Sequence, residues 1–161
     1  MRLFIVRHAW AGERDSEKYP DDEIRPLTDQ GHKRFGCMVK RLAEAGWQPT
    51  LLATSPLVRC RQTADIIAAR VDGAPKIIEL EGLAPGSALQ QLVQWSQGKE
   101  DGLAWVGHAP DVGLLTAGLI GGGSGAIDFA KGAVASINFE DDVAIGEGQL
   151  EWLVTAKVLG C

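Results

Sequence analysis

The chain has 161 residues, 45% of them hydrophobic, and its 16 basic and 21 acidic side chains give a net charge of −5. This length predicts a single domain over residues 1–161 that is large enough to bury a core, and the negative charge argues against a non-specific binder of nucleic acid. The apolar run after Met1 is too short for a signal peptide or a membrane span, so we expect a cytoplasmic protein with no membrane partner.

The first predicted element is a buried strand over residues 2–6, which runs directly into Arg7 and His8. Residues 11–26 follow as a long polar loop that contains two prolines. Long loops without secondary structure are uncommon inside compact domains and are often functional lids, but a merely solvated connection fits this composition as well.

The next elements alternate between helix and strand. Apolar residues recur at helical spacing after a cap at Thr28 or Asp29, and Gly46 ends this helix. Ser55 and Pro56 form a start signal for a second helix. Further strands are predicted over residues 50–54, 76–80 and 103–106, and further helices after Ser87 and from Pro110 to about Ile120.

The last predicted element is an antiparallel hairpin, because residues 133–140 and 149–157 alternate between apolar and polar side chains. The glycine-rich run at 121–125 predicts a flexible loop and not a phosphate-binding loop, because no Lys-Ser/Thr pair follows it. The alternation of strands and helices therefore predicts an α/β fold with a mostly parallel sheet, finished by the hairpin.

Three of the predicted strand-to-helix junctions carry polar side chains. The first junction ends in Arg7 and His8. The second leads into a helix with Arg59 in its first turn, and the third ends in His108. In a parallel sheet these junctions lie at one edge, where helix N-termini and arginine side chains favour anions. The sequence therefore predicts an anion site at this edge.

Each of these residues also has a simpler explanation when it is considered alone. An Arg-His pair after a strand is often a salt-bridged surface pair, Arg59 could be a solvated helix charge, and His108 could be a structural histidine. Their joint placement at one edge favours the anion site over three separate structural explanations.

The cysteines and histidines give no sign of a metal site or a thiol catalyst. Cys37, Cys60 and Cys161 are expected to be free thiols, because an odd number without a secretory signal is typical of a reducing cytoplasm. Two flanking arginines would favour a Cys60 thiolate. However, a tyrosine-phosphatase loop needs an arginine six residues after its cysteine, and Ile66 stands there. The histidine spacing and the lack of C-x2-C predict no metal and no cofactor.

The motifs of this chain resemble those of the histidine phosphatase superfamily, whose fold is called phosphoglycerate mutase-like. They are Arg7-His8, S-P-L-V-R-C-R-Q-T-A at 55–64 and V-G-H-A-P at 106–110. The short length and R-P-L-T-x-x-G at 25–31 are most similar to the SixA-type phosphohistidine phosphatases. The resemblance covers essentially the whole chain and implies a three-layer α/β/α architecture.

By matching position, the resemblance makes His8 the nucleophile. It makes Arg7, Arg59 and His108, with the adjacent Ala109, the pocket for the phosphate group. The chemistry agrees, because a neutral imidazole can attack phosphorus at pH 7, and two nearby arginines should lower the pKa of His8. Phosphoryl transfer needs mainly positioning and positive groups around the oxygens, which these side chains can supply without a metal.

The chain departs from the superfamily pattern at two places. Ala9 stands where the usual R-H-G motif has glycine, so we expect a small backbone adjustment there. The acidic proton donor of larger members has no clear counterpart; Glu81 is the nearest candidate, or else a solvated turn residue. Asp111 is a weaker candidate and is better explained as a first-turn helix charge.

The leading functional hypothesis is a phosphohistidine phosphatase that acts on a protein. The resemblance implies a histidine phosphotransfer domain or a sensor kinase as the partner, with no role for nucleic acid. One alternative is a phosphatase for a small phosphate monoester, which would share the phosphate pocket. The other is a non-catalytic phosphate-binding module, which would not need a nucleophile.

Overall fold

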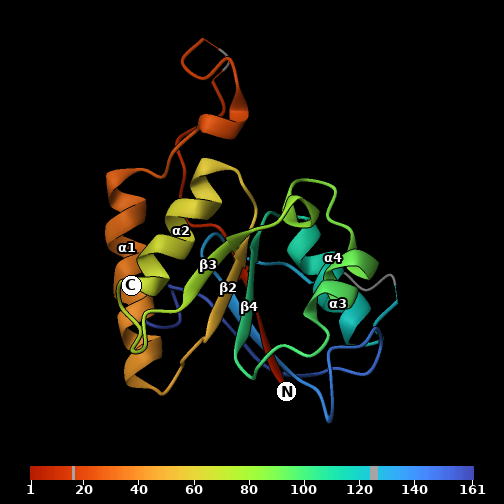
Figure 1. Ribbon diagram of the computed structural model, residues 1–161. Helices are drawn as coiled ribbons and strands as arrows, with labels where there is room; N and C mark the ends of the chain where they lie inside the picture. Colours follow the sequence, from red (N-terminus) through yellow and green to blue (C-terminus); the bar gives the residue numbers. More distant parts are fainter. Residues whose placement is uncertain (16, 124–126) are drawn as a thin grey trace.

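The computed structural model describes residues 1–15, 17–123 and 127–161, and it contains one six-stranded sheet (Figure 1). The strand order is β3-β2-β4-β1-β5-β6. The first four strands of that order are parallel, and β5 and β6 are antiparallel. The predicted parallel sheet with a closing hairpin is therefore confirmed. The strands are β1 (Arg2–Arg7), β2 (Leu51–Thr54), β3 (Lys76–Glu79), β4 (Leu103–Gly107), β5 (Val134–Asn138) and β6 (Gln149–Val154).

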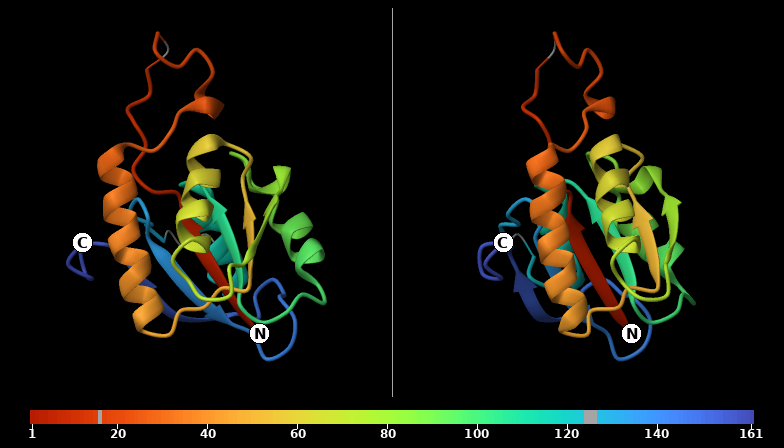
Figure 2. Two further views of the ribbon diagram at one scale, coloured as in Figure 1. Left: turned by 60° about the vertical axis from the view of Figure 1, so that its left-hand side comes forward. Right: turned by 90° about the vertical axis from the view of Figure 1, so that its left-hand side faces the viewer.

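Helices cover both faces of the sheet, so the predicted three layers are also confirmed (Figures 1 and 2). The helices α1 (Asp29–Glu44) and α2 (Val58–Ala68) lie on one face, and α3 (Leu89–Ser96) and α4 (Asp111–Leu119) lie on the other. Side chains of β1 alternate between the two resulting cores: Phe4 and Val6 pack on the side of α1 and α2, whereas Leu3 and Ile5 pack on the other side. This is why the strand is apolar throughout.

The start of α1 follows the predicted cap. The Thr28 hydroxyl accepts a hydrogen bond from the Gly31 amide at 2.9 Å, and the Thr28 amide donates to the Trp10 carbonyl at 2.9 Å. A Cβ at Gly31 would collide with the same Trp10 carbonyl. The glycine of the R-P-L-T-x-x-G stretch is thus needed because the helix begins directly against the segment that follows β1. Gly46 follows the helix with a φ of 94°, as predicted.

Two predicted helix starts are shifted in the structure. Ser55 and Pro56 precede α2, which begins at Val58 without a side-chain cap. The Ser55 hydroxyl instead contacts a histidine of the site described below. Ser87 likewise does not cap α3, whose N-cap residue is Ala88.

The polar segment after β1 projects from the body of the molecule beyond the N-terminal ends of α1 and α2 (Figures 1 and 2). We call residues 12–26, of which Ser16 is not described, the projecting loop. A bridge between Ala11 and Leu27 and a hydrogen bond from the Gly12 amide to the Pro26 carbonyl at 3.3 Å close its base. One short 3-10 turn, η1 (Asp22–Ile24), lies within it.

The expectation of three free thiols is wrong for two of the cysteines. Cys37 on α1 and Cys161 form a disulfide with 5.9 Å between their Cα atoms. The C-terminal segment packs against α1, where Arg34 Nε donates to the Cys161 carbonyl at 3.1 Å. The disulfide joins cysteines 124 positions apart in the sequence, so cysteine counting could not reveal it. Cys60 is free and buried.

Among the described residues, no helix is long and apolar enough to cross a membrane. The glycine-rich run predicted as a flexible loop is described only as far as Gly123, and Ser124 and Gly125 lie outside the described residues.

Candidate active site

The sheet brings the three predicted junctions together at one edge. Arg7 at the end of β1 pairs with Gly107 at the end of β4, and the His8 amide donates to the Gly107 carbonyl at 2.9 Å. On the other side of β4, the Ser55 amide after β2 donates to the Val106 carbonyl at 3.0 Å. As a result, the rings of His8 and His108 lie with their centroids 5.3 Å apart. Parallel pairing alone thus explains why these distant residues meet.

Helix α2 ties the segments around this edge together. The Thr63 hydroxyl accepts a hydrogen bond from the Ala9 amide at 3.0 Å and donates to the Arg59 carbonyl at 2.7 Å. The Gln62 side chain accepts from the Leu27 amide at 2.8 Å. Gln62 and Thr63, the Q-T pair of the motif at 55–64, therefore bind the backbone just after and just before the projecting loop. Ala9 is fully buried and has no positive φ, so its backbone does not require glycine.

The His8 ring is neutral and has one nitrogen without a proton. Its Nδ1 lies 2.7 Å from the Ala9 carbonyl, which can only accept, so Nδ1 carries the proton and Nε2 keeps its lone pair. The pKa of His8 is lowered to about 3, mainly by burial. The hydrogen bond to Ala9 opposes this shift, and the nearby His108, Arg59 and Arg7 add to it. The predicted direction is confirmed, but burial and not the arginines is the main cause.

His108 is held from the side of β2 and α2. Its Nε2 lies 2.9 Å from the Ser55 hydroxyl and 3.4 Å from the Cys60 sulfur. Burial, followed by the charge of Arg59, lowers the pKa of His108 to about 4, so this ring is neutral near pH 7. Sequence reasoning missed Ser55 as a site residue, because a Ser-Pro pair before a helix reads as a capping signal.

Both arginines leave one edge of the guanidinium group open. Arg7 Nη1 donates to the Phe129 carbonyl at 2.5 Å, and Arg59 Nη1 donates to the Asp22 carbonyl at 2.8 Å. Among the described residues, the Nε atoms of both arginines are buried without a hydrogen-bond partner. A buried donor without an acceptor costs about 1–3 kcal/mol, and an anionic oxygen could act as the acceptor for each of them. The arrangement therefore fits a ligand with several anionic oxygens.

Comparison with known proteins identifies the family. Residues 3–85 match the family model described as "Histidine phosphatase superfamily (branch 1)". The chain belongs to the histidine phosphatase superfamily. Membership makes it a phosphatase with a histidine nucleophile. An uncharacterised protein of Picosynechococcus sp. is 39% identical over 117 residues, which cover 70% of this chain and 69% of the relative.

Solved structures show the same fold for this histidine phosphatase. The protein histidine phosphatase SixA in complex with tungstate superposes with a TM-score of 0.86 at 24% identity, covering 99% of both chains. A protein of Agrobacterium tumefaciens described as a "putative phosphohistidine phosphatase SixA" superposes with a TM-score of 0.77 at 18% identity, covering 96% of this chain and 97% of that one. A phosphoserine phosphatase of Entamoeba histolytica gives 0.65 at 15% identity, covering 96% of both chains.

The sequence named three other residues as possible members of this site. Glu81 is exposed at the start of a 3-10 turn, η2 (Glu81–Leu83), and no hydrogen bond or ion pair among the described residues joins it to either site histidine or either site arginine. Asp111 accepts a hydrogen bond from the Gly86 amide at 2.9 Å in the first turn of α4. Ala109 is exposed and lines a hollow of about 410 Å³ with Phe129.

Cys60 is unsuited to be a nucleophile. Burial raises the pKa of its thiol to about 12, although the charge of Arg59 acts in the opposite direction. The idea that flanking arginines would favour a thiolate is therefore wrong, because the loss of solvation outweighs their charge.

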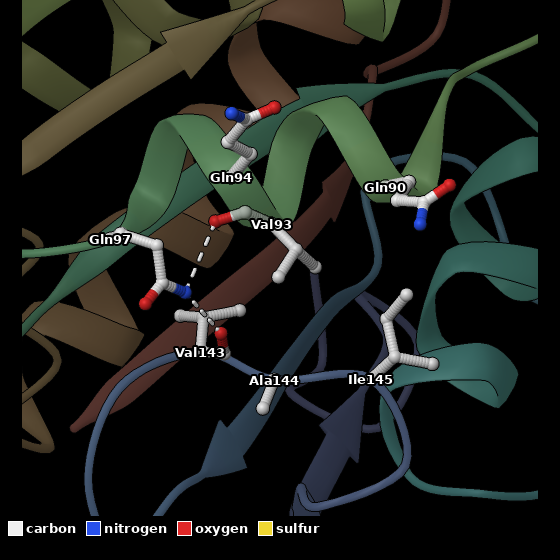
Figure 3. Close-up of a pocket in the computed structure, with 7 residues that line it drawn as sticks. All are labelled: Gln90, Val93, Gln94, Gln97, Val143, Ala144 and Ile145. Atoms are coloured by element: carbon white, nitrogen blue, oxygen red, sulfur yellow. Dashed lines mark hydrogen bonds between the residues drawn. The ribbon is translucent and has the colours of Figure 1, made fainter.

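A larger hollow of about 520 Å³ lies between α3 and the loop that joins β5 to β6 (Figure 3). Gln97 lies at one end of it, and its side-chain amide donates to the Val143 carbonyl at 2.7 Å. The hollow offers no titratable side chain and so no groups for phosphoryl transfer; it is lined by Gln90, Val93, Gln94, Gln97, Val143, Ala144 and Ile145. Elsewhere in the described ranges, no group of three or more metal-ligating side chains that could hold an ion occurs.

The buried histidines predict that this phosphatase loses stability in mild acid. The unfolded chain binds protons at histidine below about pH 6.5, whereas His8 and His108, with pKa values of about 3 and about 4, do not in the folded state. The free energy of unfolding should therefore fall as pH drops from 6.5 toward 4, by about 2 kcal/mol for each histidine at pH 5. Urea unfolding at pH 7 and pH 5 measures this, and His108→Gln should lose less than wild type. Equal losses of stability for wild type and His108→Gln would contradict the lowered pKa assigned to His108.

Proposed function

We propose that this phosphatase removes phosphoryl groups from phosphohistidine on a protein, with His8 as the residue that accepts the phosphoryl group. The observation that carries the proposal is a neutral His8 with a free Nε2, next to two arginines whose buried Nε atoms have no acceptor. The first feature supplies a nucleophile, and the second supplies donors for phosphoryl oxygens.

In the first step, His8 Nε2 attacks the phosphorus of the substrate. A P–N bond forms to His8, the P–N bond to the substrate imidazole breaks, and the substrate nitrogen keeps the electron pair and takes a proton from solvent. Arg7 and Arg59 stabilise the equatorial oxygens, and His108 donates a further hydrogen bond. This set of donors makes a metal unnecessary for the proposed step.

In the second step, water attacks the phosphoryl group on His8. The P–N bond to Nε2 breaks, the imidazole recovers its lone pair, and phosphate leaves with the oxygen and the protons of the water, which it exchanges with solvent. The hydrogen bond from Nδ1 to the Ala9 carbonyl keeps the ring in one orientation through both steps. Burial keeps the recovered imidazole neutral, which readies it for the next turnover.

The chain has no well-supported general acid, and this favours a P–N substrate over a P–O substrate. An ester expels an alkoxide, whose basicity is on the scale of water at roughly 15.7, and it needs a positioned acid worth about 10²–10⁴-fold. A phosphohistidine expels an imidazole, whose conjugate acid has a pKa near 6.5 and which gains its proton from solvent. Glu81 is the acid candidate, and its exposed position gives it little support.

The proposed substrate is a phosphorylated protein, either a histidine phosphotransfer domain or a sensor kinase. Support comes from the solved structure of a protein histidine phosphatase, which shares the fold over 99% of both chains. A second candidate is a small phosphate monoester, favoured by the fold that the chain shares with a phosphoserine phosphatase. A pure binding module is disfavoured, because it needs no histidine with a free Nε2.

A comparison of three substrates tests the proposal. The value of kcat/KM is measured on a phosphorylated histidine phosphotransfer protein, on an aryl phosphate and on an alkyl phosphate, for wild type and for Glu81→Gln. We expect kcat/KM to be highest on the phosphorylated protein, lower on the aryl phosphate and lowest on the alkyl phosphate. Glu81→Gln should have little effect on the first substrate, and a chelator should have no effect. If an alkyl phosphate is the best substrate and Glu81→Gln destroys its hydrolysis, Glu81 is a general acid and the monoester function replaces the proposed one.

A further inference from the structure

Asp22, in the projecting loop, contacts the guanidinium group of Arg59 at two points. The Asp22 carboxylate lies 3.1 Å from Arg59 Nη2, and the Asp22 carbonyl accepts from Arg59 Nη1 at 2.8 Å. Both contacts are to the outer nitrogens of the guanidinium group. The Nε atom on the remaining edge is buried and has no hydrogen-bond partner within the described part of the chain. Asp22 therefore occupies one edge of the Arg59 fork and leaves the other free for a ligand.

Asp22 is itself held in place. Arg25 Nε contacts the other Asp22 carboxylate oxygen at 2.8 Å, and Arg25 Nη1 donates to the Gly12 carbonyl at 2.6 Å. The Arg59 and Arg25 side chains are only 5% and 13% exposed, whereas the Asp22 side chain is 30% exposed, so these ion pairs are shielded from water mainly on the arginine side. A chain of contacts thus runs from the base of the projecting loop through Arg25 and Asp22 to Arg59.

We propose that Asp22 is a positioning residue, which holds the guanidinium group of Arg59 with its Nε edge turned toward the phosphoryl oxygens. This inference rests on the proposed function of the site as a phosphoryl pocket. An arginine side chain has many rotamers, and fixing its planar fork before the substrate arrives removes that ordering from the transition state. Fixation by a residue of the projecting loop also gives that loop a role in phosphoryl transfer.

The alternative is that the Asp22 carboxylate competes with the phosphoryl group for Arg59. The two hypotheses make different predictions for phosphate binding once the Asp22 carboxylate is removed. A competitor, once removed, would leave Arg59 more available, so inorganic phosphate would bind more tightly. Removal of a positioning residue would leave Arg59 disordered, so kcat would fall and phosphate would not bind more tightly.

The test compares Asp22→Ala with Asp21→Ala on an aryl phosphate. Asp21 is the matched control, because its side chain caps the same 3-10 turn by accepting from the Glu23 amide at 2.9 Å. We expect Asp22→Ala to lose about 10- to 100-fold in kcat with a small change in KM, and Asp21→Ala to stay near wild type. Asp22→Asn keeps an acceptor oxygen and should recover part of the loss. It also serves as the test variant if Asp22→Ala does not fold.

A double-mutant cycle asks whether Asp22 acts through Arg59. In the Arg59→Ala background, Asp22→Ala should have no further effect on kcat/KM. An undiminished effect there, an equal loss in Asp21→Ala, or tighter inhibition of Asp22→Ala by inorganic phosphate would each overturn the proposal. The aryl phosphate and inorganic phosphate keep this outcome separate from the choice of natural substrate, because both report on the pocket alone.

Discussion

Replacement of His8 by alanine is expected to abolish turnover while the fold survives. The substitution removes the only proposed acceptor of the phosphoryl group, and loss of a catalytic nucleophile costs on the order of 10⁴-fold or more in kcat. Within the described residues the side chain makes one hydrogen bond, to the Ala9 carbonyl, and His8 comes after the last paired residue of β1. Its removal should therefore disturb the core little.

The measurement for His8→Ala is steady-state turnover together with thermal unfolding. His32→Ala is the matched control, because His32 lies half-buried on α1 and makes no contribution to the proposed site. We expect the control to retain activity. Turnover of the His8→Ala protein close to that of wild type would show that another group attacks phosphorus.

The second large effect is expected for Arg59→Ala. The lost donor is buried and would act on the transition state in a site shielded from water, so we expect a loss of about 2.7–4 kcal/mol, or 10²–10³-fold in kcat/KM. Arg59→Lys should recover only part of this, because an ammonium group cannot make the two-point contact. The variant also leaves Asp22 without its buried partner, so its stability must be measured alongside.

Arg61→Ala is the control for the Arg59 experiment. Arg61 lies on the same helix, but it is exposed and pairs with Asp65 at 3.1 Å and with Glu79 at 2.9 Å. Surface pairs of this kind contribute about 0–1 kcal/mol, so activity and fold should change little. A loss of activity for Arg61→Ala equal to that for Arg59→Ala would indicate a general electrostatic effect of the helix and not a specific pocket.

The convergence of the four main residues was predictable from the sequence, because it follows from topology. Once β1, β2 and β4 are parallel neighbours, the side chains at their carboxyl ends must share an edge. The helix motif adds Arg59 through a turn that begins at that same edge. No side-chain detail was needed for this step.

The partners of these residues were not predictable in the same way. Asp22 reaches Arg59 across 37 positions of sequence from a loop with no regular pattern. Serine is a common helix cap, yet the Ser55 hydroxyl contacts His108. In both cases the sequence signal is a short polar residue with several ordinary uses, and only the packed structure selects one. The disulfide between Cys37 and Cys161 escaped prediction for the same reason, since the path of the C-terminal segment is set by packing.

The central claim, that His8 carries the phosphoryl group during turnover, is tested most directly by trapping that group on the enzyme. A phosphorylated substrate is mixed with wild-type protein, the reaction is quenched in alkali, and the modified residue is located by mass spectrometry. We predict one acid-labile phosphoryl group on His8, which appears and decays at rates compatible with turnover. A phosphoryl group on His108 or on Cys60, or turnover with no phosphorylated enzyme at any time, would contradict the claim.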